Sequence, residues 1–447
     1  SYARGLICGL QMFDSRLYDE EKPFIHMEAI PTFEFLKSQV ETGYFEELIQ
    51  RYLLDNTHGT VVIIRPEQGR TARMDKEQAE KLKAYKDSLT AEEIESLVRS
   101  TKELEAYQEE ESSPEDLAKI PVLRRQDISR EIAPVYNTEM DVQGVKMVHH
   151  DVETNGIGYV TLMFDLSGIR EELLPYVGIL QSVLGIIDTA DHEYGELFNE
   201  INVHTGGIGT SLELYADATK VKEKEFRATF EMKGKALYPK MDVLFAMMRE
   251  ILMESNLEDE KRLKEILAML RSRLQMSFLS SGHTTAALRA LSYTSPIAKF
   301  KDDTDGIGFY EVVKTVEEDF EGHKEELIRN LKMISEKIFR ADNLMISYTS
   351  AQEGLAPMRS AFDVIRSGLN DSLPSGEVKG ADTPCIIHCR KRNEGFKTSS
   401  KVQYVARAGN FIDGGAEYTG ALQILKVILS YDYLWQNVRV KGGAYGC

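Results

Sequence analysis

The chain has 447 residues, of which 42% are hydrophobic and 28% are charged, and its formal net charge is −18. This composition is ordinary for a folded globular protein, and the length allows roughly two to four domains. The acidic balance argues against general nucleic-acid binding, because phosphate contacts need clustered Lys and Arg. No stretch approaches the ~18 apolar residues of a membrane span, and no signal-peptide pattern is visible. Four cysteines are too few for a disulfide framework, so we expect a reducing compartment, either the cytoplasm or an organellar matrix.

The residue pattern of the first 70 positions, 1–70, predicts helices followed by a closing strand. Apolar residues with helical spacing form two clusters, namely Phe33, Leu36 and Val40, and then Phe45, Leu48, Ile49 and Tyr52. Residues 61–64, Val-Val-Ile-Ile, predict a short buried strand that ends before Pro66.

Residues 71–130 predict a charged helical hairpin that serves as a linker. The segment is rich in Glu and Lys, and its apolar stripes are thin. Thr90 followed by Glu93 is typical of a capping box, so a second helix is expected to begin there. A solvated surface hairpin without function remains the alternative interpretation.

Residues 131–365 predict one α+β domain. Alternating apolar residues indicate strands at 159–164 and 226–232, a glycine-rich turn at 204–209 leads into a strand at 208–214, and residues 344–348 close the domain. Two helices are indicated by apolar stripes, one with Met241, Leu244, Phe245, Met248, Ile251 and Leu252, the other with Leu263, Leu267, Leu270, Leu274 and Phe278.

Residues 366–447 predict the start of a second, similar domain that is cut short. Strands are expected at 385–389 and 402–406, followed by a helix with an apolar side. The short matches Gly-Ile-Leu-Gln at 178–181 and Gly-Ala-Leu-Gln at 420–423 are each expected to open a helix, which favours a repeated unit. Because the chain starts at Ser1 and ends within a glycine turn, we expect a fragment of a longer protein.

The common catalytic motifs are absent from the sequence. Neither H-E-x-x-H nor H-x-x-E-H occurs among the nine histidines, and there is no G-x-S-x-G or P-loop. His149 and His150 are adjacent, so on a strand they would point to opposite faces and not bind one ion. Cys385, His388 and Cys389 suggest a metal site only weakly, because no second Cys/His pair completes a tetrahedral set. We therefore assign no metal ligand to this chain.

The closing segment, Tyr-Leu-Trp-Gln-Asn-Val-Arg-Val-Lys-Gly-Gly-Ala-Tyr-Gly at 433–446, resembles the arginine–tyrosine motif of insulinase/pitrilysin-type zinc metallopeptidases. The form of this motif is similar to that of the presequence-protease branch. Residues 52–58, 173–176 and 204–208 resemble other parts of the same branch. The resemblance covers essentially the whole chain.

The resemblance implies four homologous α+β domains, each an antiparallel sheet with packed helices, joined as two halves by a helical hairpin and closing around a peptide. Residues 1–70 would then be the end of the second domain and residues 71–130 the hinge. Residues 131–365 would be a non-catalytic third domain, and residues 366–447 the truncated start of the fourth. The zinc would be bound by an amino-terminal half outside this chain. The helix equivalent to the zinc helix, near residues 176–185, contains no His and no carboxylate.

By this resemblance, two residues of the family's motif correspond to Arg439 and Tyr445 in this chain. The resemblance implies that both are catalytic and substrate-binding residues. A cation at a helix carboxyl end is favoured by the helix dipole, and the guanidinium of Arg439 can hold a substrate carbonyl. The hydroxyl of Tyr445, beyond the Gly442–Gly443 turn, can stabilise an oxyanion as water attacks a peptide. From the residues alone, a helix cation and a strand tyrosine without function are the simpler interpretation.

Two functions are therefore carried forward. In the first, the chain is the carboxyl-terminal half of a zinc metalloendopeptidase that degrades unstructured peptides in a closed chamber, and this half alone is inactive. Its partners are then the amino-terminal zinc-binding half and the peptides, with no nucleic acid and no membrane. In the second, the parent protein is an inactive homologue that acts as a peptide-binding or assembly scaffold.

Overall fold

The computed structural model describes residues 4–110, 112–131, 134–217, 219–220, 225–369, 387–399 and 402–446. The chain divides into two compact units, Ser1–Ile128 and Ser129–Cys447. Each unit is described by itself.

The first unit contains the helices that the apolar spacing predicted. They are α2 (Ala29–Gln39), α3 (Tyr44–Ile49) and the π-helical turn η1 (Gln50–Leu54), and a further helix, α1 (Arg4–Arg16), precedes them. The strand predicted at 61–64 is wrong, because these residues are irregular and their side chains are 73 to 89% exposed. A β-strand needs a neighbouring backbone for its hydrogen bonds, and no described strand pairs with this segment.

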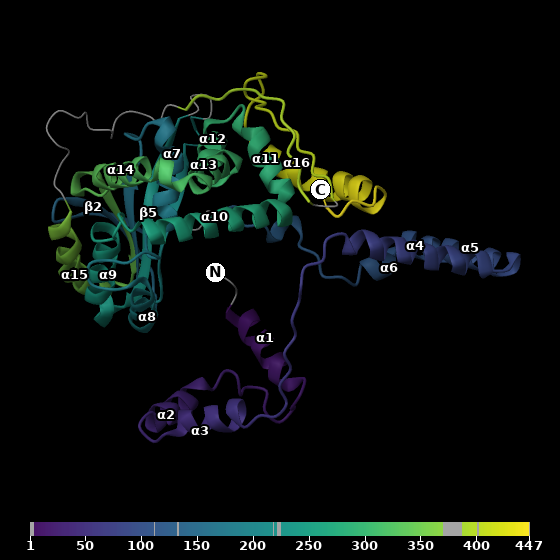
Figure 1. Ribbon diagram of the computed structural model, residues 1–447, viewed down its shortest axis with the longest axis horizontal. Coiled ribbons are helices and arrows are strands. Elements are labelled where there is room, and N and C mark those ends of the chain that lie inside the picture. The colour runs from purple at the N-terminus through teal and green to yellow at the C-terminus, as the bar shows by residue number, and fades with distance from the viewer. Residues whose placement is uncertain are drawn as a thin grey trace. The chain divides into compact units, whose positions relative to one another are not determined.

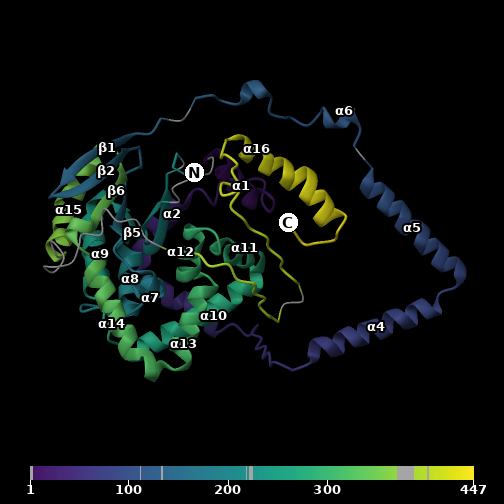
Figure 2. The same cartoon turned by 90° about the horizontal axis from the view of Figure 1, so that it is seen from above.

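The charged segment is helical, and its second helix begins after Thr90 as predicted. Helices α4 (Arg70–Ser88) and α5 (Ala91–Glu109) are joined by a sharp bend, which Figure 2 shows. At that bend the Thr90 hydroxyl accepts a hydrogen bond from the Glu93 amide, and the Glu93 carboxylate accepts one from the Thr90 amide. This reciprocal capping box satisfies amide groups that the first turn of a helix leaves without partners. Two short helices follow, α6 (Pro114–Leu117) and η2 (Arg125–Asp127).

The second unit is built on a six-stranded sheet with the order β1-β2-β6-β3-β5-β4. The strands are β1 (Asn137–Val142), β2 (Val145–Asp151), β3 (Ile157–Asp165), β4 (Ile208–Ala216), β5 (Phe226–Leu237) and β6 (Leu344–Ser350). All neighbouring strands are antiparallel except β2 and β6, which run parallel. The strands predicted near 159, 208, 226 and 344 are confirmed, whereas β1 and β2 were missed.

Helices account for the rest of this α+β unit, and α9 and α15 lie side by side next to the sheet (Figure 1). In chain order they are η3 (Glu171–Leu173), α7 (Leu174–Val183), α8 (Tyr194–His204), η4 (Tyr238–Lys240), α9 (Met241–Met253), α10 (Glu260–Ser280), α11 (Gly282–Ser292), α12 (Pro296–Asp305), α13 (Ile307–Glu318), α14 (Phe320–Ile338), η5 (Ala341–Asn343), η6 (Gln352–Gly354) and α15 (Leu355–Gly368). The two helices predicted from the Met and Leu stripes are confirmed as α9 and α10.

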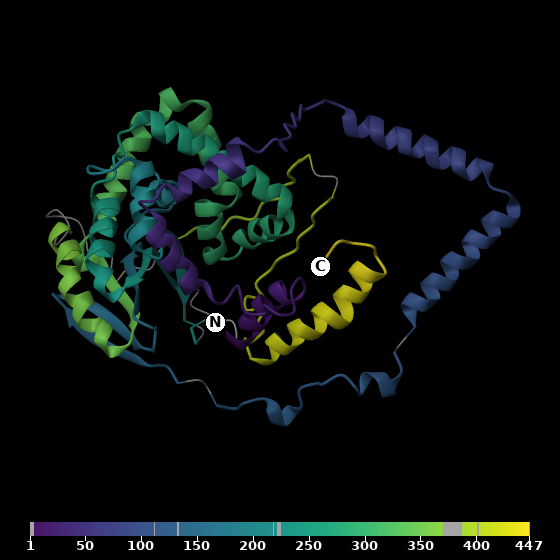
Figure 3. The ribbon, with the colours of Figure 1, turned by 90° about the horizontal axis from the view of Figure 1, so that it is seen from below.

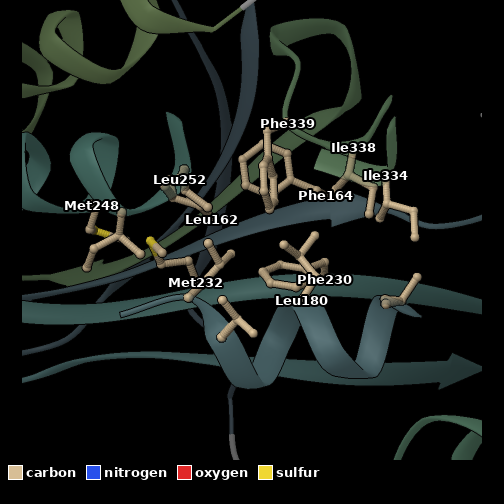
Figure 4. Packing of buried hydrophobic residues seen from close by; sticks show 14 of the residues in the cluster. Leu162, Phe164, Leu180, Phe230, Met232, Met248, Leu252, Ile334, Ile338 and Phe339 are labelled. Carbon is tan, nitrogen blue, oxygen red and sulfur yellow. The ribbon is translucent and has the colours of Figure 1, made fainter. Parts of the chain in front are cut away.

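One face of the sheet carries the hydrophobic core. Leu162 on β3 pairs with Ile346 on one side and Met232 on the other, and all three are fully buried. Side chains from α7, α9 and α14 pack on this face (Figure 4). Phe339 contacts the rings of Phe164 and Phe230 edge to face, at centroid distances of 5.1 and 5.2 Å. Because strand side chains alternate between faces, the positions between these buried residues form a second, more polar face.

A buried carboxylate fixes the loop between α7 and α8. Glu250 on α9 is 6% exposed, and its Oε1 lies 2.8 Å from Nδ1 of His192. The Thr189 hydroxyl donates to the same oxygen. The hydrogen bond with Glu250 raises the pKa of His192 above its ordinary value, while burial opposes this shift. The loop is therefore held more tightly when His192 is protonated.

The stability of the second unit should consequently depend on pH through His192. Since the folded state has the higher pKa, its contribution is complete below the ordinary value of 6.5 and is lost as pH rises through the raised pKa. Urea unfolding is expected to show a lower free energy at mildly alkaline than at slightly acid pH. A His192→Gln variant should lose this part of the dependence; an unchanged pH profile in that variant would contradict the assignment.

The last described segments do not contain the strands expected there. Residues 387–389 and 402–406 are irregular, and Cys385 lies outside the described residues. No partner strand is described beside these segments, which is the same physical reason as for residues 61–64. The expected helix is present as α16 (Ala421–Ile428) and the π-helix η8 (Leu429–Val440). Gly420 precedes α16 as predicted, but Gly178 lies in the middle of α7, so the match at 178–181 does not open a helix.

Candidate functional site

The candidate site lies at the end of the last helix. Figure 3 shows α16 continuing into η8 as one straight helix. The wider π-helical hydrogen bonding reaches the end of this helix, where the Lys441 amide donates to the Gln436 carbonyl at 3.0 Å. Segments of π-helix are rare and occur frequently at functional sites.

The glycine turn after the helix ends it and redirects the chain. Gly443 has a φ of +67°, a left-handed conformation that favours glycine. The Gly443 and Ala444 amides donate to the carbonyls of Arg439 and Val438 at 2.9 and 3.1 Å. These bonds satisfy two carbonyls that the helix end would leave free. The turn thereby fixes how the chain leaves the helix, two residues before Tyr445.

Arg439 lies in the last turn of η8, as the sequence predicted. Its Cζ is 4.2 Å from the ring centroid of Trp435. Among the described residues, no hydrogen bond or ion pair occupies its guanidinium group. The helix dipole favours a cation at this end, so the guanidinium is held near the helix end with its donors available.

Tyr445 is 92% exposed, and its hydroxyl has no hydrogen-bond partner in the described part of the chain. No hydrogen bond joins Tyr445 and Arg439 within that part either. Both polar groups are therefore free to contact a further molecule. The cation–π contact between Trp435 and Arg439 was missed, although four-residue spacing on a helix was a signal for it.

The polar face of the sheet is a second feature that the sequence did not reveal. Glu231 on β5 is only 2% exposed, and its Oε1 accepts hydrogen bonds from Tyr215 at 2.6 Å and Thr229 at 3.0 Å. Lys233 bridges Glu231 and Glu213 at 3.1 and 2.8 Å. Burial and the neighbouring Glu231 raise the pKa of Tyr215 well above its ordinary value, so its hydroxyl stays protonated. Alternation of polar residues in β4 and β5 was the available signal.

The residues described here do not fit a zinc site. Within the described ranges, no group of three or more His, Cys, Asp or Glu side chains could hold a metal ion. Helix α7 forms where the equivalent of a zinc helix was expected, and it contains no His or carboxylate. His149 is buried against Ser350, whereas His150 lies between Asn137 and Ser347 on the other face. His388 lies 2.9 Å from a carboxylate oxygen of Glu171.

None of the helices in the described part of the chain is long and apolar enough to cross a membrane.

Comparison with known proteins places the chain in a peptidase class. The sequence profile of the family described as associated with peptidase M16, subfamily C, matches residues 64–316, more than half of the chain. The profile of the PreP C-terminal domain matches residues 393–447. The chain belongs to this family associated with subfamily C of peptidase M16, which confirms the resemblance that the closing motif indicated.

Two curated relatives align along this chain. Protein HypA of Clostridium perfringens is 34% identical over 446 residues, covering 100% of this chain and 45% of the relative. Presequence protease 1, chloroplastic/mitochondrial, of Arabidopsis thaliana is 28% identical over 451 residues, covering 100% and 41%. The chain thus spans less than half the length of these relatives. A solved structure described as a peptidase M16 inactive domain from Pseudomonas fluorescens aligns at a TM-score of 0.37 and 10% identity, covering 54% of this chain and 53% of that chain.

Proposed function

We propose that this chain forms the carboxyl-terminal half of a zinc-dependent metalloendopeptidase that degrades unstructured peptides in a closed chamber. The observation that carries the proposal is the site at the end of η8. There, the closing motif of this peptidase-associated chain presents Arg439 and Tyr445 with their polar groups unoccupied in the described part of the chain. Zinc belongs to the proposal through the family, and its ligands would lie in an amino-terminal half outside these 447 residues.

In this proposal, each part of the chain has a physical role. The polar face of the six-stranded sheet lines the chamber and contacts the peptide. The guanidinium of Arg439 donates to a substrate carbonyl, and the Tyr445 hydroxyl donates to the oxygen on which negative charge develops as water adds. Donors that are fixed before the reaction stabilise this charge without having to reorganise. In this proposal the chain alone is inactive, because it supplies these contacts while its described part offers no group of residues that fits the metal.

The test uses the longer protein that contains this chain. It is expected to cleave an unstructured fluorogenic peptide, to lose activity on chelation and to recover it with zinc. The Arg439→Ala variant should lower kcat/KM roughly 10- to 150-fold, the cost of one hydrogen bond to a charged group, while metal analysis shows unchanged zinc.

Two results would reject the proposal. If the Arg439→Ala variant cleaved the peptide at the wild-type rate, the proposed role of Arg439 would be rejected. A longer protein that binds the peptide but does not cleave it with zinc present would favour the scaffold function. Metal analysis of the purified 447-residue chain provides an independent check, and no stoichiometric zinc is expected.

A further inference from the structure

Trp435 and Arg439 form a cation–π pair on the surface of η8. The Cζ of Arg439 lies 4.2 Å from the indole centroid, well within the ~6 Å that characterises a cation–π contact. Trp435 is 38% exposed and is the single tryptophan of the chain. It precedes Arg439 by four residues, so both side chains lie on the same side of the helix.

We propose that Trp435 is a positioning residue for Arg439 in peptide cleavage, an inference that rests on the proposed function. The indole holds the guanidinium plane in the orientation in which Arg439 meets the substrate. Trp435 itself does not contact the reacting atoms.

The geometry of the two groups supports this role. A guanidinium stacks through its face, whereas its N–H donors point outward in its plane. The indole ring offers no lone-pair acceptor, so its contact restricts Arg439 without pairing the donors that a substrate carbonyl needs. An arginine without such a partner would have to lose its rotational freedom at the moment of binding, which weakens each contact that it makes.

Among the described residues, Trp435 is the group that orients the guanidinium of Arg439. Among the described residues, no carboxylate forms an ion pair with Arg439, and no hydrogen bond fixes its head group. A carboxylate partner would compete with the substrate for the donors, whereas an aromatic face does not. The pair thus combines a fixed cation with free donors.

The first test measures the pair in the 447-residue chain, independently of peptidase activity. Because Trp435 is the only tryptophan, its fluorescence reports on this site alone. Replacing Arg439 by Ala uncovers the indole face, so the emission should shift to longer wavelength. Lys441→Ala is the matched control and should leave the emission unchanged. Identical spectra for Arg439→Ala and the wild type would overturn the contact between Arg439 and the indole.

The second test measures the role in the longer protein. Trp435→Leu should lower kcat/KM about two- to fivefold, the range of an exposed cation–π contact. Trp435→Phe, which keeps an aromatic face, should recover most of the loss. Tyr431→Leu removes an aromatic ring that is 67% exposed on the same helix, and it should have no effect.

A double-mutant cycle separates positioning from a general structural effect. In the Arg439→Ala background, Trp435→Leu should change kcat/KM no further, because the group that it positions is gone. Additive losses would overturn the proposal and indicate a structural role. If Arg439→Ala alone has no effect, the proposed function fails. If Arg439→Ala is slow and Trp435→Leu is not, only the positioning role fails.

Discussion

Removing the hydroxyl of Tyr445 is expected to lower kcat of the longer protein about 10²–10³-fold, the usual cost of losing one donor to a developing oxyanion. The Tyr445→Phe variant keeps the ring and loses only the group that donates. KM should change little, because the negative charge that this hydroxyl stabilises develops only in the transition state. Steady-state kinetics on an unstructured peptide would measure both parameters.

The structure makes this variant a clean test. Tyr445 is 92% exposed and its hydroxyl has no partner among the described residues, so its loss breaks no contact within the described part of this chain. Tyr431→Phe is the matched control, since Tyr431 is also exposed, at 67%, and lies on the same helix outside the proposed site. Equal kcat values for Tyr445→Phe and the control would show that Tyr445 takes no part in the reaction.

The largest effect on stability is expected at Asp302, which forms a buried ion pair. The Arg289 and Asp302 side chains are 8% and 1% exposed. Asp302 also accepts hydrogen bonds from the amides of Ile307 and Gly308 at the start of α13, at 3.1 and 3.3 Å. Asp302→Ala should lower the free energy of unfolding by about 3–5 kcal/mol, because it removes a buried charged hydrogen bond of Arg289 and leaves the two amides at the start of α13 without their acceptor. Urea unfolding at neutral pH would measure the change.

A matched variant separates the ion pair from simple helix capping. Asp319 caps α14 by accepting from the Gly322 amide at 3.2 Å, but it is exposed. Asp319→Ala should cost only about 1 kcal/mol, the usual value for an amino-terminal cap. If Asp302→Ala costs no more than this, Arg289 is already compensated by its second partner, Glu394.

Glu394 is that second partner, and it connects the segment at 387–399 to α11. Arg289 donates to both carboxylate oxygens of Glu394, at 2.8 and 3.0 Å. The hydrogen bonds from Arg289 lower the pKa of Glu394 to about 2, against a smaller opposing effect of burial. Since the folded pKa is depressed, this stabilisation is present above the ordinary value of 4.5 and is lost as pH falls toward 2.

Predictions from local pattern succeeded where a short segment of sequence decides the structure. The capping box at Thr90 depends on a residue three positions away, and the stripes of α9 and α10 depend on spacing within one helix. The strands at 159 and 344 were visible because buried and less buried residues alternate along them. Residues 61–64 have the same β-forming composition but no described partner, so composition alone predicted a strand that the structure does not form.

The sequence by itself determined the α+β character of the second unit, the start of the helix after Thr90, the family of the chain and the place of Arg439 at the end of the last helix. Only the tertiary structure decided the strand order, the parallel pairing of β2 and β6, the burial of Glu231 and the ion pair of Arg289 with Asp302. The physical reason is distance along the chain. Helix periodicity and caps are set by near neighbours, whereas strand pairing and buried charges join residues whose proximity exists only after folding.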